Sequence, residues 1–124
     1  MSLRLTVLPD RFAVCRCERA PEISSLTGGL VALVRTEQEL SLVCAQAEAP
    51  ASAKVEKGWR ALKVEGPLPF HLTGILHGIL TPLAARGIAI FAVSTYDTDY
   101  VLLKDERLAE ACEALSAAGY ELLK

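Results

Sequence analysis

The stretch from Leu72 to Lys104, "LTGILHGILTPLAARGIAIFAVSTYDTDYVLLK", decides the fold because its hydrophobic spacing changes midway. Over Thr73–Arg86 apolar residues recur every three or four positions, which predicts an amphipathic helix that ends at Gly87. Two apolar runs follow, at Ile88–Thr95 and Tyr100–Lys104, and the polar side chains between them predict a tight hairpin of two strands.

Segments on either side of this stretch complete a recognisable order of elements. Gly58–Glu65 predicts a strand before the helix, Asp105–Ala118 a second helix after the hairpin, and Tyr120–Leu123 a last strand. The resulting β-α-β-β-α-β order is that of the ferredoxin-like plan, in which two helices cover one face of an antiparallel sheet. We therefore predict an α+β, ferredoxin-like domain over residues 58–124.

The first half of the chain has a different pattern, with short strand-like runs separated by turns. These runs are Leu3–Leu8, Arg11–Cys17, Leu30–Glu37 and Leu40–Gln46. The Ala-rich segment Ala47–Lys57, which contains a proline and a serine, is interpreted as a linker. We predict that residues 1–57 form a separate β-rich unit.

Composition narrows the classes of function. The 124 residues are 52% hydrophobic and carry a net charge of −2, so no basic surface for DNA or RNA is expected. The longest unbroken apolar run, Ile88–Val93, is far too short to span a membrane, and no signal peptide is recognised. These features predict a cytoplasmic protein, and the high apolar content predicts an oligomer, with a homodimer as the simplest case.

The residues typical of catalytic and metal sites are scattered. The four cysteines, Cys15, Cys17, Cys44 and Cys112, lie in apolar segments, which favours reduced and buried thiols. His71 and His77 lack the spacing of a metal motif, and neither a phosphate-binding loop nor a nucleophile elbow is present. We expect no catalytic activity, no metal site and no cofactor.

Two other segments suggest a binding site for a small molecule. Thr73 is predicted to cap the first helix, and beside it Gly74 leaves the helix N-terminus accessible to an anion. Asp97 and Thr98 fit an ordinary turn. Asp99, in contrast, opens an apolar strand, where a carboxylate is costly unless a cation or donors meet it. A free amino acid carries both charges that such a pair of groups would bind.

A resemblance strengthens this hypothesis. The segments "GWRALKVEGPLPF", "LTGILHGILTPLAARGIAIFAVSTYDTDYVLLK" and the closing helix resemble the ACT domain, over roughly Gly58 to Leu123. They are most similar to the tandem-ACT group, which includes the CASTOR arginine sensor and small bacterial proteins. The first half is similar to the degenerate first ACT-like unit of that group. The resemblance implies βαββαβ modules that pair side by side and bind small regulatory ligands, commonly amino acids.

Site residues follow from the resemblance by position. In the arginine sensor the pocket is formed by the loop before the first helix and by a Ser-Thr-aromatic-x-x-Asp hairpin. The corresponding residues here are Phe70, Leu72, Thr73, Gly74 and Ile75 in the loop, and Thr95, Tyr96 and Asp99 in the hairpin. His71 in the loop and Asp97 in the hairpin are further candidates to line the same pocket. Leu72 stands where the sensor has an acidic residue, so a neutral or apolar amino acid is expected instead of arginine.

Three hypotheses follow. The first is a non-catalytic regulatory protein that binds an amino acid and acts on a protein effector. The second is a structural module whose sheets only dock to other proteins, which the apolar excess would explain. The third is an enzyme on the same plan, because ferredoxin-like folds host many chemistries, although no nucleophile or base is identified for it.

Overall fold

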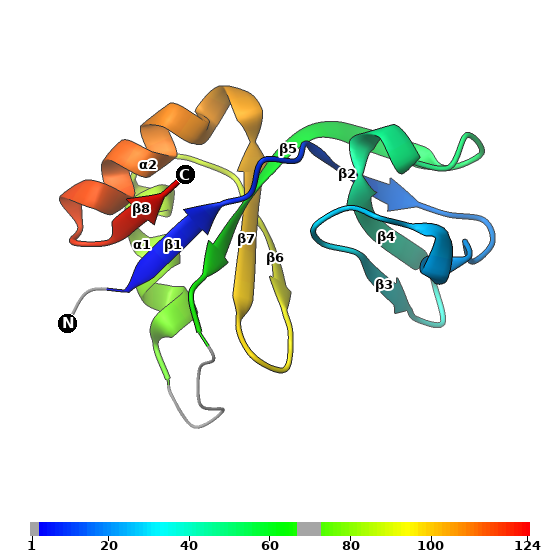
Figure 1. Cartoon of the computed structure of the whole chain (residues 1–124), viewed down its shortest axis with the longest axis horizontal. Coiled ribbons are helices and arrows are strands. Elements are labelled where there is room, and N and C mark those ends of the chain that lie inside the picture. Colours follow the sequence, from blue (N-terminus) through cyan, green and yellow to red (C-terminus); the bar gives the residue numbers. More distant parts are fainter. Residues whose placement is uncertain (1–2, 67–72) are drawn as a thin grey trace. The chain divides into compact units, whose positions relative to one another are not determined.

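In the computed structural model, which describes residues 3–66 and 73–124, the chain forms two compact units. Unit 1 comprises Met1–Pro9 and Arg60–Lys124, and unit 2 comprises Asp10–Trp59. The boundary falls inside one long strand, β5 (Lys54–Val64), so each unit contains part of that strand. The elements of both units are labelled in Figure 1.

Unit 1 is a five-stranded sheet with two α-helices. Its elements are β1 (Arg4–Val7), part of β5, α1 (Ile75–Ala85), β6 (Phe91–Ser94), β7 (Asp99–Lys104), the 3-10 turn η3 (Asp105–Arg107), α2 (Leu108–Ala117) and β8 (Glu121–Leu123). The strand order is β8-β1-β5-β7-β6. In the middle of this sheet, Leu5 of β1 lies opposite Val64 of the antiparallel β5 and opposite Leu122 of the parallel β8.

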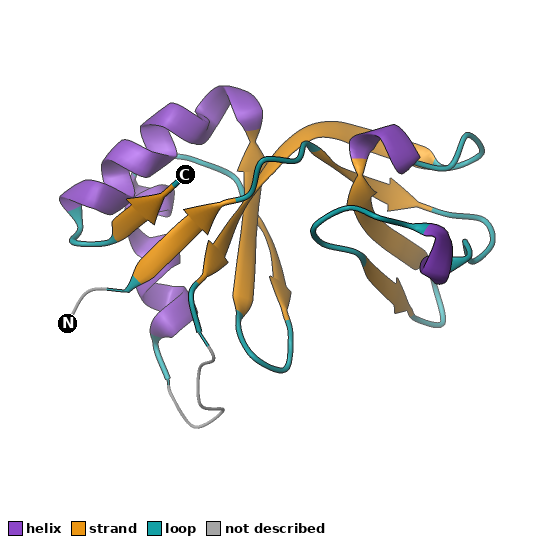
Figure 2. Cartoon of the chain, in the orientation of Figure 1, coloured by secondary structure: helices purple, strands orange, loops and turns teal. Residues whose placement is uncertain are grey.

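The core of unit 1 lies between the helices and one face of the sheet. Alternate residues of the strands point to that face, and residues of both helices meet them in a single buried cluster. The cluster includes Leu5, Leu62, Val64, Val101 and Leu103 from the strands and Ile79, Leu83, Ala111 and Leu115 from the helices. Figure 2 shows the two helices beside the strands of this unit.

The predicted α+β, ferredoxin-like fold is confirmed, because β5, α1, β6, β7, α2 and β8 follow the βαββαβ order. The position of β1 in the sheet was not predicted. In the simple plan the first and last strands, here β5 and β8, pair directly, whereas in this structure β1 lies between them. The predicted cap at Thr73 is wrong. The N-cap residue of α1 is Gly74, which has no side chain to cap the helix.

Unit 2 follows the same plan with its helices reduced to single turns. Its elements are β2 (Phe12–Arg16), η1 (Ile23–Ser25), β3 (Ala32–Arg35), β4 (Leu40–Ala45), η2 (Gln46–Glu48) and part of β5. The strand order β3-β4-β2-β5, with every neighbouring pair antiparallel, is the ferredoxin-like order. The β-rich unit expected in the first half is therefore a degenerate version of the same fold.

Two expectations for the first half can be compared with this unit. The linker predicted at Ala47–Lys57 is wrong, because β5 already begins at Lys54. The prediction of reduced thiols is confirmed: all four cysteines are free, with Cys15, Cys17 and Cys44 buried and Cys112 partly buried. The division of the chain into domains at residues 1–57 and 58–124 stays a prediction. Of the two compact units, the one that contains α1 and α2 also contains β1.

Candidate functional site

The polar turn between β6 and β7 is closed by hydrogen bonds among its own residues. Thr95 donates from its backbone N–H and its hydroxyl to the carbonyl oxygen of Thr98, at 2.8 and 3.1 Å. The Thr98 N–H in turn donates to the Thr95 hydroxyl oxygen at 3.2 Å. Tyr96 and Asp97 at the tip are exposed. The two threonines therefore shape the turn, as short polar side chains commonly do.

A second contact fixes this turn to the middle of the sheet. The Thr98 hydroxyl is buried and donates a hydrogen bond of 2.6 Å to the carbonyl oxygen of Val64, at the C-terminal end of β5. From there the chain continues towards the start of α1. The turn and the α1 N-terminus consequently belong to the same end of unit 1, as Figure 1 also shows.

Asp99 lies on the face of the sheet that the helices cover. Side chains alternate along a strand, so Asp99 shares its face of β7 with Val101 and Leu103, which belong to the core beneath the helices. Ser94 of β6 lies directly opposite Asp99, and its hydroxyl donates a hydrogen bond of 2.5 Å to Asp99 Oδ1. This contact uses one carboxylate oxygen and holds the side chain on that face.

The start of α1 is open. Gly74 has φ +78°, a left-handed conformation that favours glycine, and a Cβ built there would meet no atom within 4 Å. The first backbone bond of the helix runs from Gly78 N–H to Gly74 O at 2.9 Å. Amide groups before Gly78 therefore have no acceptor within the helix, and Gly74, the N-cap residue, has no side chain that could cap them. Such amides can bind an anion.

The structure places the predicted site residues as follows. Thr73, Gly74 and Ile75 lie at the start of α1, and Ile75 packs against the core. The hairpin residues Thr95, Tyr96, Asp97 and Asp99 lie in or beside the turn. Phe70, His71 and Leu72 are outside the described residues. Sequence reasoning missed Ser94, which the register with Asp99 identifies, and it treated Thr98 only as a turn residue.

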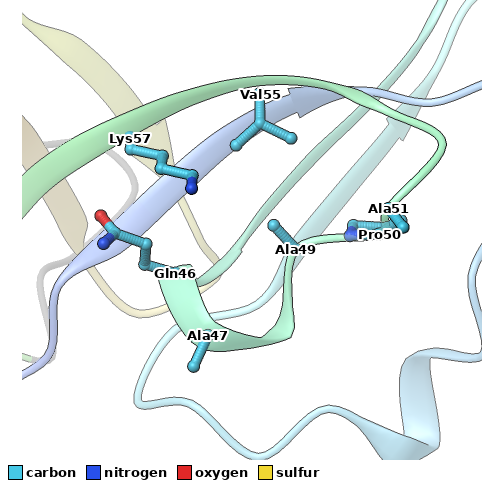
Figure 3. A pocket seen from close by; sticks show the side chains of 7 residues that line it. All are labelled: Gln46, Ala47, Ala49, Pro50, Ala51, Val55 and Lys57. Carbon is cyan, nitrogen blue, oxygen red and sulfur yellow. The ribbon is translucent and has the colours of Figure 1, made fainter.

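A hollow of about 520 Å³ lies elsewhere, in unit 2. Its lining residues come from η2, from the loop after it and from the first part of β5 (Figure 3): Gln46, Ala47, Ala49, Pro50, Ala51, Val55 and Lys57. No pattern in the sequence indicated this hollow, and its segment was interpreted as a linker.

Two kinds of reactive group can be assessed in the described parts of the chain: metal-binding clusters and cysteine thiols. Within residues 3–66 and 73–124, no cluster of three or more histidine, cysteine or carboxylate side chains is arranged to hold a metal ion. Burial raises the pKa of the Cys44 thiol to about 12 and raises the pKa of Cys15 as well, so both stay protonated and poorly nucleophilic near neutral pH. None of the helices in the described ranges is long and apolar enough to cross a membrane.

Comparisons with solved structures return two bacterial proteins that resemble nearly the whole chain. Protein Atu0741 from Agobacterium tumefaciens is 34% identical with a TM-score of 0.89, over 99% of this chain and 93% of that one. VC0802 from Vibrio cholerae, described as a protein of unknown function and possible transport protein, is 20% identical with a TM-score of 0.74, over 94% and 90%.

A third resemblance concerns the fold. The regulatory subunit of aspartate kinase from Thermus thermophilus, in a ligand-free form, is 10% identical with a TM-score of 0.67, over 93% of this chain and 96% of that one. A comparison with curated proteins finds none that matches the sequence. The ACT domain model matches residues 54–117, from the start of β5 to the end of α2. That match covers more than half of the sequence, and the chain therefore belongs to the ACT domain family.

Proposed function

We propose that this chain is a non-catalytic regulatory protein that binds an amino acid at the end of unit 1 where α1 begins and β6 turns into β7. The observation that carries the proposal is the position of Asp99. Its carboxylate lies on the helix-covered face at the start of β7, held by Ser94, at the end of the unit where the first amides of α1 have no acceptor within the helix.

The two ends of this site favour ligand groups of opposite charge. The α1 amides and the helix dipole favour a negative group, such as the ligand's α-carboxylate. Asp99 favours a positive group, such as the ligand's α-ammonium, and its Oδ2 has no hydrogen bond within the described residues. A zwitterion satisfies both ends, whereas an inorganic anion or a simple amine satisfies only one.

The comparisons support a regulatory role of this general kind. Membership of the ACT domain family agrees with ligand binding, and structures of similar fold include the regulatory subunit of an aspartate kinase. A closer kinship with the tandem-ACT group of the arginine sensor remains a prediction. Leu72 is expected to disfavour a guanidinium, so we propose a neutral or apolar amino acid as the ligand.

The proposal extends to assembly and location. We expect a homodimer in the cytoplasm that transmits ligand binding to a protein effector. Within the described residues β6 pairs as a strand only with β7, which makes it the edge of the unit 1 sheet, and we propose that a second copy of the chain adds to the sheet at this edge. Light scattering coupled to size exclusion tests this part, and a strictly monomeric species would contradict it.

A thermal-shift screen of the twenty amino acids tests the binding proposal. A ligand at a hundred times its Kd stabilises by about 2.7 kcal/mol, which for a chain of this size raises Tm by roughly ten degrees. Asp99→Asn should abolish the shift. Glu106→Gln, an equivalent change at an exposed position of η3, should leave it intact. If no amino acid changes Tm at millimolar concentration, the proposal is wrong.

A docking module without a ligand is the second candidate. It is favoured by two exposed apolar side chains of unit 2: Val34 on the edge strand β3 is 56% exposed and Ile23 in η1 is 41% exposed. Under this hypothesis Val34→Lys would abolish self-association or partner binding, and no amino acid would stabilise the protein. The screen described above therefore separates the two candidates.

A further inference from the structure

Three of the four cysteines lie together in the core of unit 2. Cys15 on β2, Cys17 just after β2 and Cys44 on the neighbouring strand β4 belong to one buried cluster. Alternate residues of a strand point to the same face of a sheet, so all three thiols lie on the face where this cluster packs. The site proposed at Asp99 lies in unit 1 and uses none of them.

The register of β2 and β4 brings two of these side chains into contact. Ala13 lies directly opposite Cys44, and Leu42 lies directly opposite Cys15, so the two cysteines are diagonal neighbours. Because Ala13 carries only a methyl group, it leaves space for the Cys44 side chain to lean towards Cys15. The Cys44 thiol donates a hydrogen bond to the Cys15 sulfur. The two free thiols are therefore in direct contact.

The surroundings of this pair favour uncharged sulfur. Cys15 is 2% exposed and Cys44 is 0% exposed. Burial is the main reason that the pKa of the Cys44 thiol is raised to about 12, and the nearby Glu48 carboxylate adds to the effect. Among the described residues no cation contributes to this shift. A metal ion would need both sulfurs as thiolates, and structural zinc takes four ligands, whereas a disulfide bond carries no charge.

We infer that Cys15 and Cys44 are a redox modification site, which a small-molecule disulfide converts into an internal disulfide bond. The Cys15 thiolate attacks one sulfur of the small disulfide, whose S–S bond breaks and releases one small thiolate. The Cys44 thiolate then attacks the Cys15 sulfur, breaks this mixed disulfide and releases the second small thiolate. The released thiolates take up the protons that the cysteines have lost. The pair of cysteines is oxidised, and the small disulfide is reduced to its two thiols.

Burial controls the rate of this reaction. A small disulfide cannot reach either sulfur while β2 and β4 are paired, so the reaction requires a local opening of unit 2. Opening exposes the thiols to water, where their ordinary acidity returns. When the strands pair again, their register brings Cys44 to the Cys15 mixed disulfide and selects this bond over others.

The diagonal position makes the bond easy to reduce. Cα atoms of diagonal partners on neighbouring strands are farther apart than those of directly opposite residues. The bond therefore draws β2 and β4 together locally and stores strain, which makes it more reducible. We expect an excess of a small thiol to restore both cysteines.

The inference is tested by incubating the reduced full chain with oxidised glutathione and then blocking the remaining thiols with an alkylating reagent. Trypsin cleaves after Arg16, so Cys15 and Cys17 fall on separate peptides, 12–16 and 17–19, and Cys44 falls on peptide 36–54. Mass spectrometry without reduction should find peptide 12–16 linked to peptide 36–54 as the main crosslink. Treatment with excess reduced glutathione before the blocking step should remove it.

Matched variants assign the pair. Cys44→Ala and Cys15→Ala should each abolish the crosslink. Cys17→Ala and Cys112→Ala remove thiols outside the pair and should leave its yield unchanged. In the variant that combines Cys17→Ala with Cys112→Ala, Cys15 and Cys44 are the remaining thiols, and the crosslink should still form within one chain.

Three results would overturn the inference. Glutathione attached to single cysteines without any link between peptides 12–16 and 36–54 would mean that the thiols do not pair. A main crosslink through Cys17 or Cys112, or one that joins two chains, would exclude the assigned pair. A bond that resists excess reduced glutathione would exclude a reversible site.

Discussion

The Thr98 hydroxyl donates a hydrogen bond of 2.6 Å to the carbonyl oxygen of Val64, and Thr98 is the one buried polar residue in the described parts of the chain. The contact joins the β6–β7 turn to the end of β5. It therefore supports both the sheet and the position of Asp99, the next residue along the chain.

Replacing Thr98 by valine, which has the same shape but no donor, should destabilise the protein by about 1 to 3 kcal/mol, because the Val64 carbonyl loses a buried partner. Urea unfolding measures the change. Thr81→Val is the control: its hydroxyl donates to His77 O at 2.8 Å but is exposed, so the expected cost is within ~0.5 kcal/mol. Equal costs for the two variants would contradict the prediction.

A Cβ added at Gly78 in α1 would lie 2.7 Å from the Tyr120 hydroxyl oxygen, so a side chain there requires the Tyr120 ring to shift. In an open helix alanine would stabilise by about 1 kcal/mol relative to glycine. Here Gly78→Ala should destabilise by about 1 to 2 kcal/mol. In a Tyr120→Phe background the penalty should fall, giving a coupling energy of at least ~0.5 kcal/mol in a double-mutant cycle. Additive effects would mean that the close approach has no energetic weight.

Ser94 should tune ligand affinity without contacting the ligand itself. Ser94→Ala removes the hydrogen bond to Asp99 Oδ1 and should weaken amino-acid binding by up to about tenfold, since one bond contributes roughly 1 kcal/mol. Ser94→Thr keeps the hydroxyl and should restore the affinity, which isothermal titration calorimetry can measure. A Thr variant as weak as the Ala variant would indicate a packing defect. This prediction depends on the proposed function.

Alkaline pH should destabilise unit 2 through its buried thiols. The pKa of the Cys44 thiol is raised from 9.0 to about 12 in the folded protein, mainly by burial and to a smaller extent by the neighbouring Cys15. The unfolded chain therefore loses the thiol proton first, and stability that is fully present below pH 9 is lost as pH rises towards 12. Urea unfolding at successive pH values should show this decline. Cys44→Ala should make it shallower, whereas an unchanged slope would point to other groups.

The fold was predictable where local pattern and tertiary packing agree. The helix period over Thr73–Arg86 reflects a face that packs on the sheet, and the hairpin is marked by its polar turn. The place of β1 was not predictable, because its parallel pairing with β8 joins Leu5 to Leu122 across most of the chain. The strand predicted from Gly58 covers most of β5, but the first part of β5, residues 54–57, was missed because Gly58 and the Ala-rich residues before it resemble a break.

In the candidate site, too, some features could be predicted from the sequence and others depend on the three-dimensional structure. Asp99 could be chosen as a candidate site residue from the sequence, because a carboxylate is unusual at the start of an apolar strand. Ser94 was not, since a serine at the end of a strand is unremarkable by itself. The register of the hairpin could have revealed it: a four-residue turn over residues 95–98 places Ser94 opposite Asp99. The hollow beside Lys57 depends on an absent helix, which no short pattern in the sequence reports.

The topology of β1 also determines how the protein can be dissected. Leu8 N–H donates to Ala61 O at 2.9 Å, so the two points where the chain leaves and re-enters unit 1 are neighbours. A fragment starting at Gly58 would leave β5 and β8 without the strand that joins them. An excised version, in which a two-residue Asn-Gly turn connects Pro9 to Arg60, would close β1 and β5 into a hairpin. Unit 1, which carries the proposed site, could then be produced as a minimal folded module.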